Sequence, residues 1–358
     1  MHPTTPLRGR GALSNPDGRF ESRRSGAFDD GWDSRADFPE RIATTVRPEI
    51  VRRLISRNDS PDIPFDQGIN PYRGCEHGCI YCYARPSHSY VGLSPGLDFE
   101  TQIFAKKNGP EALERELRNP RYVPRVISIG ANTDPYQPLE RDLEITRDIL
   151  KVLLRHRHPT AIITKSASVL RDLDLLQELA AMNLAQVHIS VTSLKNSIAR
   201  SMEPRASAPR RRLEAIRQLK AAGVPVGMMV APIVPGLTDE ELEHNLEAGA
   251  AAGATRAGYV LLRLPHELKS LFAEWLDQHF PERADRVLHL LRSMRGGEDN
   301  DPRFGSRMRG TGSQAQLIAR RFEIAARING LNTSRQELDC GRFVHRPEQG
   351  RQLRLMGL

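Results

Sequence analysis

Several features that would assign a protein chain to a class are scarce in this sequence. Its 358 residues include only 4 cysteines, too few for a scaffold held together by disulfides. No apolar segment is long enough to cross a bilayer, and the longest, residues 226–234, contains a glycine and a proline. Residues 1–40 lack the apolar stretch of a secretory signal. We therefore expect a cytoplasmic protein with no membrane partner.

The charge balance of the chain is basic. It carries 52 lysines and arginines against 44 aspartates and glutamates, a net charge of +8, and its pI is near 9.6. Basic residues gather in two zones, 200–220 and 303–321, which makes nucleic acid a candidate partner. A solvated helix surface is the favoured interpretation of the first zone, because residues 210–212 span most of a helical turn and share no single face.

Composition divides the chain into three parts. Residues 1–45 are rich in glycine, arginine, aspartate, serine and proline and show no periodicity, which predicts a flexible N-terminal arm. Residues 46–285 alternate between strand-like and helix-like runs. Residues 286–358 begin with a polar, glycine-rich and basic loop, and a helix expected over 313–329 makes this part a C-terminal helical extension.

The middle part contains six short β-branched runs that read as strands. They lie near residues 66–70, 126–129, 161–164, 187–191, 224–231 and 258–262. Helical patterns separate them: one carries a leucine stripe from 139 to 153, and Thr238 with Glu241 forms a capping box at the start of another. The alternation predicts an α/β fold with parallel strands and right-handed crossovers. Six units fit either a barrel or an open, doubly wound sheet.

Three of the four cysteines lie within eight residues, with the spacing C-x3-C-x2-C. Thiolates that converge from one short loop, here Cys75, Cys79 and Cys82, are metal ligands far more often than core residues. Gly74 and Gly78 allow the backbone to fold tightly around such ligands. The segment therefore predicts a metal site, with its metal still to be assigned.

Two kinds of metal site fit this segment. A structural zinc site requires a fourth ligand, for which His77, His88 and Cys340 are candidates. An iron–sulfur cluster with three thiolates instead leaves one iron open to a reactive partner. The first possibility corresponds to a non-catalytic zinc or iron–sulfur protein that binds nucleic acid, and the second to an enzyme.

The cysteine spacing, the aromatic Tyr81 before the third cysteine and the position after the first strand resemble the radical S-adenosylmethionine superfamily. The resemblance implies a [4Fe-4S] cluster held by Cys75, Cys79 and Cys82, whose fourth iron chelates the amino and carboxylate groups of S-adenosylmethionine. With an external low-potential reductant, the cofactor would be cleaved to methionine and a 5′-deoxyadenosyl radical that abstracts hydrogen from an unknown substrate. The implied fold is a partial (β/α)6 TIM-like barrel over residues 46–285, with the cluster loop at 70–85.

Within the superfamily, the chain resembles the spore photoproduct lyase-like branch, often labelled DNA repair photolyase. The resemblance rests on residues 69–75, 133–140, 164–166, 190–193, 203–204, 210–212 and 231–236. That lyase is expected to carry a cysteine hydrogen donor at the end of the second strand, but residues 130–133 contain no thiol. We therefore do not expect strict lyase activity, and two alternatives stay open: a different substrate, or a tyrosine such as Tyr136 or Tyr83 as the hydrogen donor.

The resemblance also implies the residues that contact the cofactor. They are Tyr81, Asn132, Asp134, Lys165, Ser190 and Thr192. Lys165 would pair with the cofactor carboxylate, Ser190 and Thr192 would donate hydrogen bonds to that carboxylate or to the ribose, and Tyr81 would lie against the adenine. Asp134 would hold the ribose or the substrate. The plain alternatives are a solvated lysine, ordinary strand hydroxyls, a packed aromatic ring and an Asp-Pro turn.

Other residues near the strand ends receive a plainer interpretation. Met228, Met229, Leu261 and Leu262 are expected in the core rather than in a cofactor wall. Cys340 is expected to be inert. No catalytic residue is assigned from the sequence.

Overall fold

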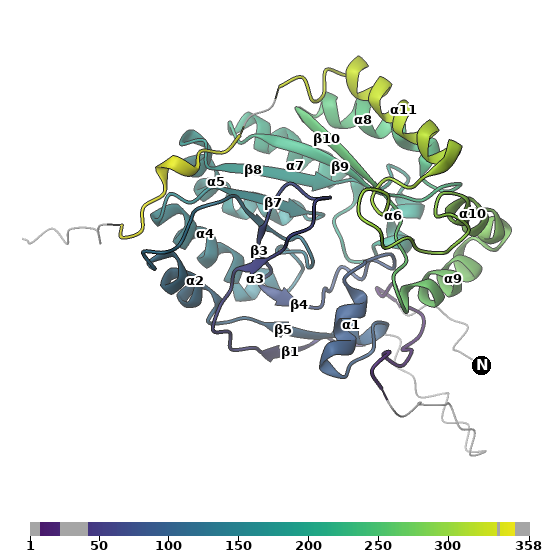
Figure 1. Cartoon of the computed structure of the whole chain (residues 1–358), viewed down its shortest axis with the longest axis horizontal. Coiled ribbons are helices and arrows are strands. Elements are labelled where there is room, and N and C mark those ends of the chain that lie inside the picture. The colour runs from purple at the N-terminus through teal and green to yellow at the C-terminus, as the bar shows by residue number, and fades with distance from the viewer. Residues whose placement is uncertain (1–7, 22–41, 335–336, 348–358) are drawn as a thin grey trace, which may run out of the picture.

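An open sheet of seven strands forms the centre of this computed structural model, which describes residues 8–21, 42–334 and 337–347 (Figure 1). The strand order is β10-β9-β8-β7-β6-β3-β2. The bounds are β2 Ser56–Arg57, β3 Gln67–Ile69, β6 Ile127–Ile129, β7 Thr160–Thr164, β8 Ala185–Ser190, β9 Val226–Ile233 and β10 Arg256–Leu261. All neighbours pair in parallel except β2, an antiparallel edge. The six predicted strands are thus confirmed.

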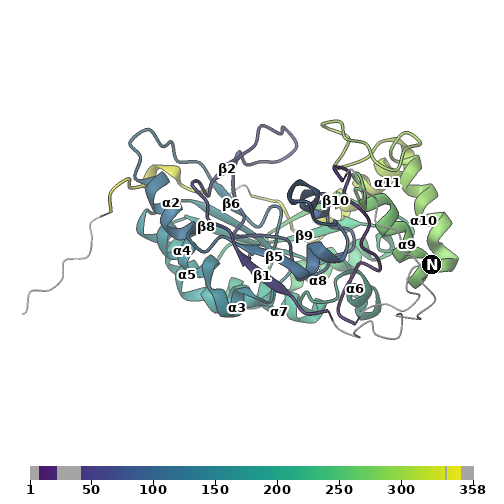
Figure 2. The same ribbon diagram turned by 90° about the horizontal axis from the view of Figure 1, so that it is seen from below.

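Helices connect the parallel strands and cover one side of the sheet (Figure 2). Their bounds are α2 Gly109–Leu117, α4 Ile145–Arg155, α5 Leu173–Ala181, α7 Pro209–Ala221 and α8 Leu242–Ala251. Apolar residues of these helices, such as Ile149, Leu176 and Leu219, are fully buried against the strands in one core. Because β10 and β2 end the sheet without meeting, the fold is the predicted partial (β/α)6 barrel of parallel strands.

Two helix predictions need correction. The leucine stripe from 139 to 153 belongs to two helices, α3 Glu140–Leu143 and α4, because Glu144 between them has a positive φ of 50°. The capping box is wrong. The Thr238 hydroxyl accepts the Val234 amide at 2.9 Å, and the Glu241 carboxylate accepts the Ser193 hydroxyl at 2.7 Å. These side chains tie the turn before α8 to neighbouring loops instead of to each other.

A second sheet of three strands flanks the cysteine segment. It consists of β1 Thr45–Pro48, β5 Gln102–Ala105 and β4 Tyr72–Arg73, in the order β1-β5-β4. The short helices η2 Arg85–Val91 and α1 Leu97–Thr101 lie between β4 and β5 in the chain. The cysteine segment therefore leaves β4 and returns to the same small sheet through α1, which fixes both of its ends.

The ends of the chain differ in part from the prediction. Residues 8–21 pack against the cysteine segment, with Ala12 fully buried. The prediction of a flexible arm is therefore wrong for these residues. Residues 1–7 and 22–41 of the predicted arm lie outside the described part of the chain.

Three further helices follow β10: α9 Leu268–His279, α10 Pro281–Ser293 and α11 Gly312–Ile328, with the expected loop before α11. α11 lies beside α8, where Arg321 pairs with Glu243 at 2.7 Å (Figure 1). The boundary expected at 285 falls inside α10, and the division of the chain into parts stays a prediction. Among the described residues, no helix is both long enough and apolar enough to span a membrane.

Candidate active site

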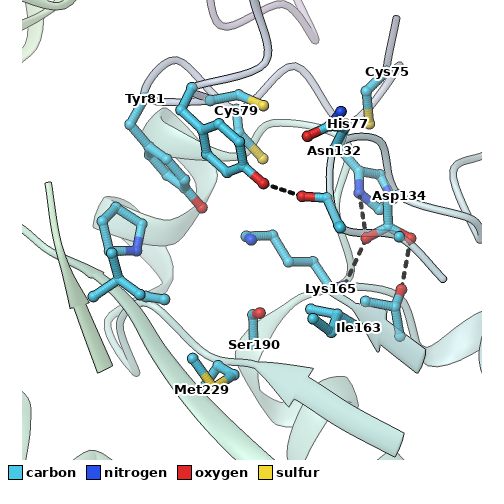
Figure 3. A pocket seen from close by; sticks show the side chains of 18 of the residues that line it. Cys75, His77, Cys79, Tyr81, Asn132, Asp134, Ile163, Lys165, Ser190 and Met229 are labelled. Atoms are coloured by element: carbon cyan, nitrogen blue, oxygen red, sulfur yellow. Dashed lines mark hydrogen bonds and ion pairs between the residues drawn. The ribbon is translucent and has the colours of Figure 1, made fainter. Parts of the chain in front are cut away.

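A cavity opens at the carboxyl ends of the parallel strands (Figure 3). Its wall combines the cysteine segment with residues at the ends of β6 to β10, and its empty volume, open mouth included, is about 980 Å³. Of the predicted site residues, the cavity brings together Cys75, Cys79, Cys82, Tyr81, Asn132, Asp134, Lys165 and Ser190. Met229 and Leu261, expected in the core, also line it.

The cysteine segment is folded so that its three thiols face this one cavity. The Cys75 amide donates to Phe99 O at 2.9 Å, and the Cys82 amide donates to Cys79 O at 3.1 Å. Gly78 has a φ of 66°, and a Cβ there would meet the buried Glu100 carboxylate. A glycine is therefore required at this turn, as the sequence pattern indicated.

Burial raises the pKa of all three thiols. The pKa of Cys79 rises to about 12, because burial and the nearby Glu203 carboxylate outweigh the attraction of the Lys165 ammonium group. Burial also raises the pKa of Cys75 well above its usual value and that of Cys82 to a lesser degree. The unligated thiols are therefore protonated at neutral pH, and binding of a metal must release these protons.

The donor set fits an iron–sulfur cluster better than a single zinc ion. Within the described residues, no three Cys, His, Asp or Glu side chains converge on one metal-ion position. A cluster needs no such convergence, because each thiolate binds a different iron. None of the three candidate fourth ligands forms a metal-ion position with the thiols within the described residues, although His77 lines the same cavity. The His77 Nδ1 lies 3.3 Å from the Asp134 carboxylate, the His88 Nε2 lies 3.0 Å from Gln102 O, and Cys340 lies beside Val126 at the amino end of β6.

Asp134 ties together three segments of the cavity wall. Its carboxylate accepts the Thr164 hydroxyl at 2.6 Å and the Lys165 amide at 2.7 Å, and it lies 3.3 Å from His77. Burial opposes ionisation, but His77 and these hydrogen bonds hold the pKa of Asp134 at about 2. Asp134 is therefore a charged anchor of the strand ends that also lines the cavity.

Lys165 and Ser190 project into the cavity (Figure 3). The Lys165 Nζ lies 5.7 Å from the centroid of the Tyr81 ring, and it makes no ion pair with a carboxylate in the described part of the chain. Asn132 stands on the wall nearer the cysteines, where its backbone amide donates to Asn70 Oδ1 at 2.9 Å. An ammonium group and a hydroxyl thus face the three thiols across an enclosed space.

Thr192 does not reach the cavity. Its hydroxyl donates to the Glu203 carboxylate at 2.6 Å, and the Tyr81 hydroxyl donates to the same carboxylate. Arg212 forms a buried ion pair with Glu203 and donates to Ser190 O at 3.0 Å. The expectation of a solvated Arg212 is therefore wrong. These side chains form a polar network behind the cavity that holds the Tyr81 ring in its wall.

A second anchor of the cysteine segment was not predicted. Glu100 is fully buried and pairs with Arg85, whose guanidinium also donates to Cys79 O at 2.9 Å and to Gly78 O at 3.1 Å. The same carboxylate accepts the amides of Gly11 and Ala12 at 3.0 and 2.8 Å. Residues 8–21 thus complete the shell around the cysteines, a role that neither composition nor periodicity indicates.

The contact between residue 11 and the cysteine segment predicts a sharp steric effect. A Cβ at position 11 would fall far inside van der Waals contact with Gly78 O. We expect Gly11→Ala to lower the free energy of unfolding by about 1–3 kcal/mol, the usual range for overpacking a buried position. Urea denaturation measures the change, and Arg8→Ala, at an exposed position, is the control. Equal stability of both variants would show that residues 8–21 do not pack there in solution.

Comparison with known proteins places these features in a family. Residues 69–248, half of the chain, match the family model of the radical SAM superfamily. An uncharacterised protein of Mycobacterium tuberculosis is 38% identical over 232 residues, covering 64% of this chain and 68% of the relative. An uncharacterised protein of Methanocaldococcus jannaschii is 27% identical over 214 residues, covering 60% and 76%.

Solved structures support the same fold. Spore photoproduct lyase complexed with dinucleoside spore photoproduct superimposes with a TM-score of 0.59 at 16% identity, over 80% of each chain. A mutant of that lyase gives a TM-score of 0.58 with the same identity and coverage. These structural matches show the fold, and the match to the family model shows that the chain belongs to the family. With three cysteines on the wall of a cavity at the strand ends, the chain belongs to the radical SAM superfamily and is an enzyme of that class.

Proposed function

We propose that Cys75, Cys79 and Cys82 hold a [4Fe-4S] cluster and that the cavity binds S-adenosylmethionine, which the enzyme cleaves to abstract hydrogen from a substrate. One observation carries this proposal: the three thiols and the Lys165 ammonium group face the same cavity. Membership of the superfamily, whose members generally use these two cofactors, supports it. The zinc alternative lacks a fourth ligand among the described residues.

The cluster, when bound and reduced from outside, supplies the electron that cleaves the cofactor to methionine and a 5′-deoxyadenosyl radical. The chain's own residues bind and orient. Lys165 provides the positive charge for the cofactor carboxylate, and Ser190 provides a hydroxyl donor beside it. Glu203 accepts the Tyr81 hydroxyl and so holds the Tyr81 ring in the wall of the cavity. The apolar side chains of Ile163 and Met229 line the cavity and exclude water from it.

The position of each candidate tyrosine in the fold bears on which one could donate the hydrogen atom that would complete the reaction. Tyr136 is excluded, because its hydroxyl is buried against the Asp172 carboxylate at 3.1 Å and the residue does not line the cavity. Tyr83 lines the cavity, and its hydroxyl donates to Ala131 O. We therefore propose Tyr83, rather than a cysteine, as the residue that faces a substrate radical.

The proposal is tested by anaerobic reconstitution with iron and sulfide. After reduction with dithionite, we expect an EPR signal of the reduced cluster that changes when S-adenosylmethionine is added, together with release of 5′-deoxyadenosine. Bound zinc, or a cluster whose EPR signal ignores the cofactor, would contradict the proposed function.

A further inference from the structure

Arg263 follows the last strand of the sheet, β10, by two residues. It lines the cavity on the side that faces the cysteine segment. Its guanidinium carbon lies 5.7 Å from the centroid of the Tyr83 ring. Tyr83 is 46% exposed, so this contact lies where the cavity opens to solvent. A group entering beside Tyr83 therefore meets the Arg263 side chain.

The Arg263 guanidinium lacks an anionic partner in the described part of the chain. Its contact with a side-chain acceptor is a long one, 3.7 Å to the sulfur of Met308, and its Nε is buried with no hydrogen-bond partner. The neighbouring Asp62 is already occupied, because it pairs with Arg307 and accepts the Gly305 amide at 2.6 Å. Burial, and then the repulsion of Arg307, lower the pKa of Arg263.

Three other buried arginines have oxygen partners for their terminal nitrogens. Arg85 pairs with Glu100, and Arg212 pairs with Glu203. Arg295, close to Arg263, donates to the carbonyl oxygens of Leu262 and Arg307, both at 2.7 Å, although its Nε, like that of Arg263, has no hydrogen-bond partner. A half-buried guanidinium without such partners is costly, since it loses water and gains no compensating hydrogen bonds. The cost is recovered when an anion binds, because guanidinium groups form forked hydrogen bonds with phosphate and carboxylate groups.

We propose that Arg263 determines substrate specificity by binding an anionic group, a phosphodiester or a carboxylate, of the molecule that enters beside Tyr83. The proposal rests on the proposed function, because it places the substrate in the same cavity as the cofactor. It assigns the anion to the substrate rather than to S-adenosylmethionine, whose carboxylate is matched by Lys165 on a different strand.

Two of the three probes, dibutyl phosphate and dibutyl methylphosphonate, differ in charge but hardly in shape. Dibutyl phosphate carries one negative charge, dibutyl methylphosphonate carries none, and hexanoate presents a carboxylate. Their dissociation constants are measured by calorimetry with the unmodified protein, with Arg263→Gln and with Arg286→Gln, which removes the same charge from an exposed position of α10. Each measurement is made with and without the reconstituted cluster.

We expect the unmodified protein to bind at least one charged probe more tightly than the neutral one, and Arg263→Gln to lose about tenfold or more of that affinity. Arg286→Gln should bind like the unmodified protein. Preference for dibutyl phosphate over hexanoate identifies a phosphodiester as the source of the anion, and the reverse identifies a carboxylate.

Three results would overturn the proposal. The first is no preference for charged probes in the unmodified protein, and the second is that Arg263→Gln binds the charged probes as tightly as the unmodified protein. The third is loss of S-adenosylmethionine binding in Arg263→Gln, measured by equilibrium dialysis, because the anion would then belong to the cofactor. Failure of the unmodified protein to form a cluster would count against the proposed function, while the charge preference is still measured without the cluster.

Discussion

Replacing Cys79 by alanine is expected to abolish both iron–sulfur loading and cleavage of S-adenosylmethionine. The three thiols line one cavity, whereas the candidate replacements His88 and Cys340 do not line it, and the His77 Nδ1 faces the Asp134 carboxylate. Loss of a residue that merely supports a ligand lowers metal affinity or activity by 10- to 100-fold, so loss of a ligand itself should cost at least about a hundredfold. Iron content, visible absorbance and release of 5′-deoxyadenosine are the measurements.

Cys340→Ser is the matched control for this experiment. Cys340 is the remaining cysteine of the chain and lies at the amino end of β6, beside Val126 and away from the cavity. We expect this variant to retain the iron content and the cleavage activity of the unmodified protein. If Cys340→Ser lost the metal as Cys79→Ala does, the fourth ligand of a zinc or iron site would be a protein residue, and the proposed open iron would be wrong.

Local patterns predicted the strands and the cysteine segment well. Each strand is a short β-branched run between turn residues, so its identity is written within a few neighbouring positions. The cysteine spacing and its glycines are equally local. Lys165 and Ser190 were named from the family resemblance, and they share one cavity because the carboxyl ends of parallel strands meet at one edge of the sheet.

Contacts between distant parts of the chain were not predictable in the same way. Glu100 and Gly11 are 89 residues apart, and Tyr81 and Glu203 are 122 residues apart, so no periodic pattern links them. Glutamates and arginines are usually solvated, which made Arg212 look like a surface residue. Only the fold shows that a buried glutamate stands beside it. Thr192 was not predictable for the same reason: its hydroxyl donates to Glu203, and the residue does not line the cavity.

The two long-range anchors act on different parts of the cysteine segment. Glu100 holds Arg85, which in turn binds the carbonyl oxygens of Gly78 and Cys79. Glu203 holds Tyr81, between the second and third cysteines. Ile80 and Tyr81 of this segment pack into an apolar cluster, and the buried charged groups fix its backbone carbonyl groups and the Tyr81 hydroxyl in addition. Because Glu203 also pairs with the buried Arg212, it is the more informative position to change.

Glu203→Ala is expected to lower the free energy of unfolding by about 3–5 kcal/mol, the range for breaking a buried ion pair by removing one partner. The substitution leaves the Arg212 guanidinium buried without its carboxylate and frees the Tyr81 hydroxyl. Urea denaturation of the protein without metal measures this change directly. Glu214→Ala, which removes the same side chain from an exposed pair on α7, should have little effect.

A double-mutant cycle separates the ion pair from a general effect of truncation. If Glu203 and Arg212 act as one unit, Glu203→Ala/Arg212→Ala should cost less than the sum of the two single changes by about 1–3 kcal/mol. Additive costs would show that the pair is not formed in solution. The iron content after reconstitution adds a second readout: because Glu203 reaches the cysteine segment through Tyr81, Glu203→Ala should retain the cluster less well than Arg8→Ala, whose residue is exposed. Equal retention would confine the role of Glu203 to the stability of the barrel and leave Glu100 as the anchor of the cluster loop.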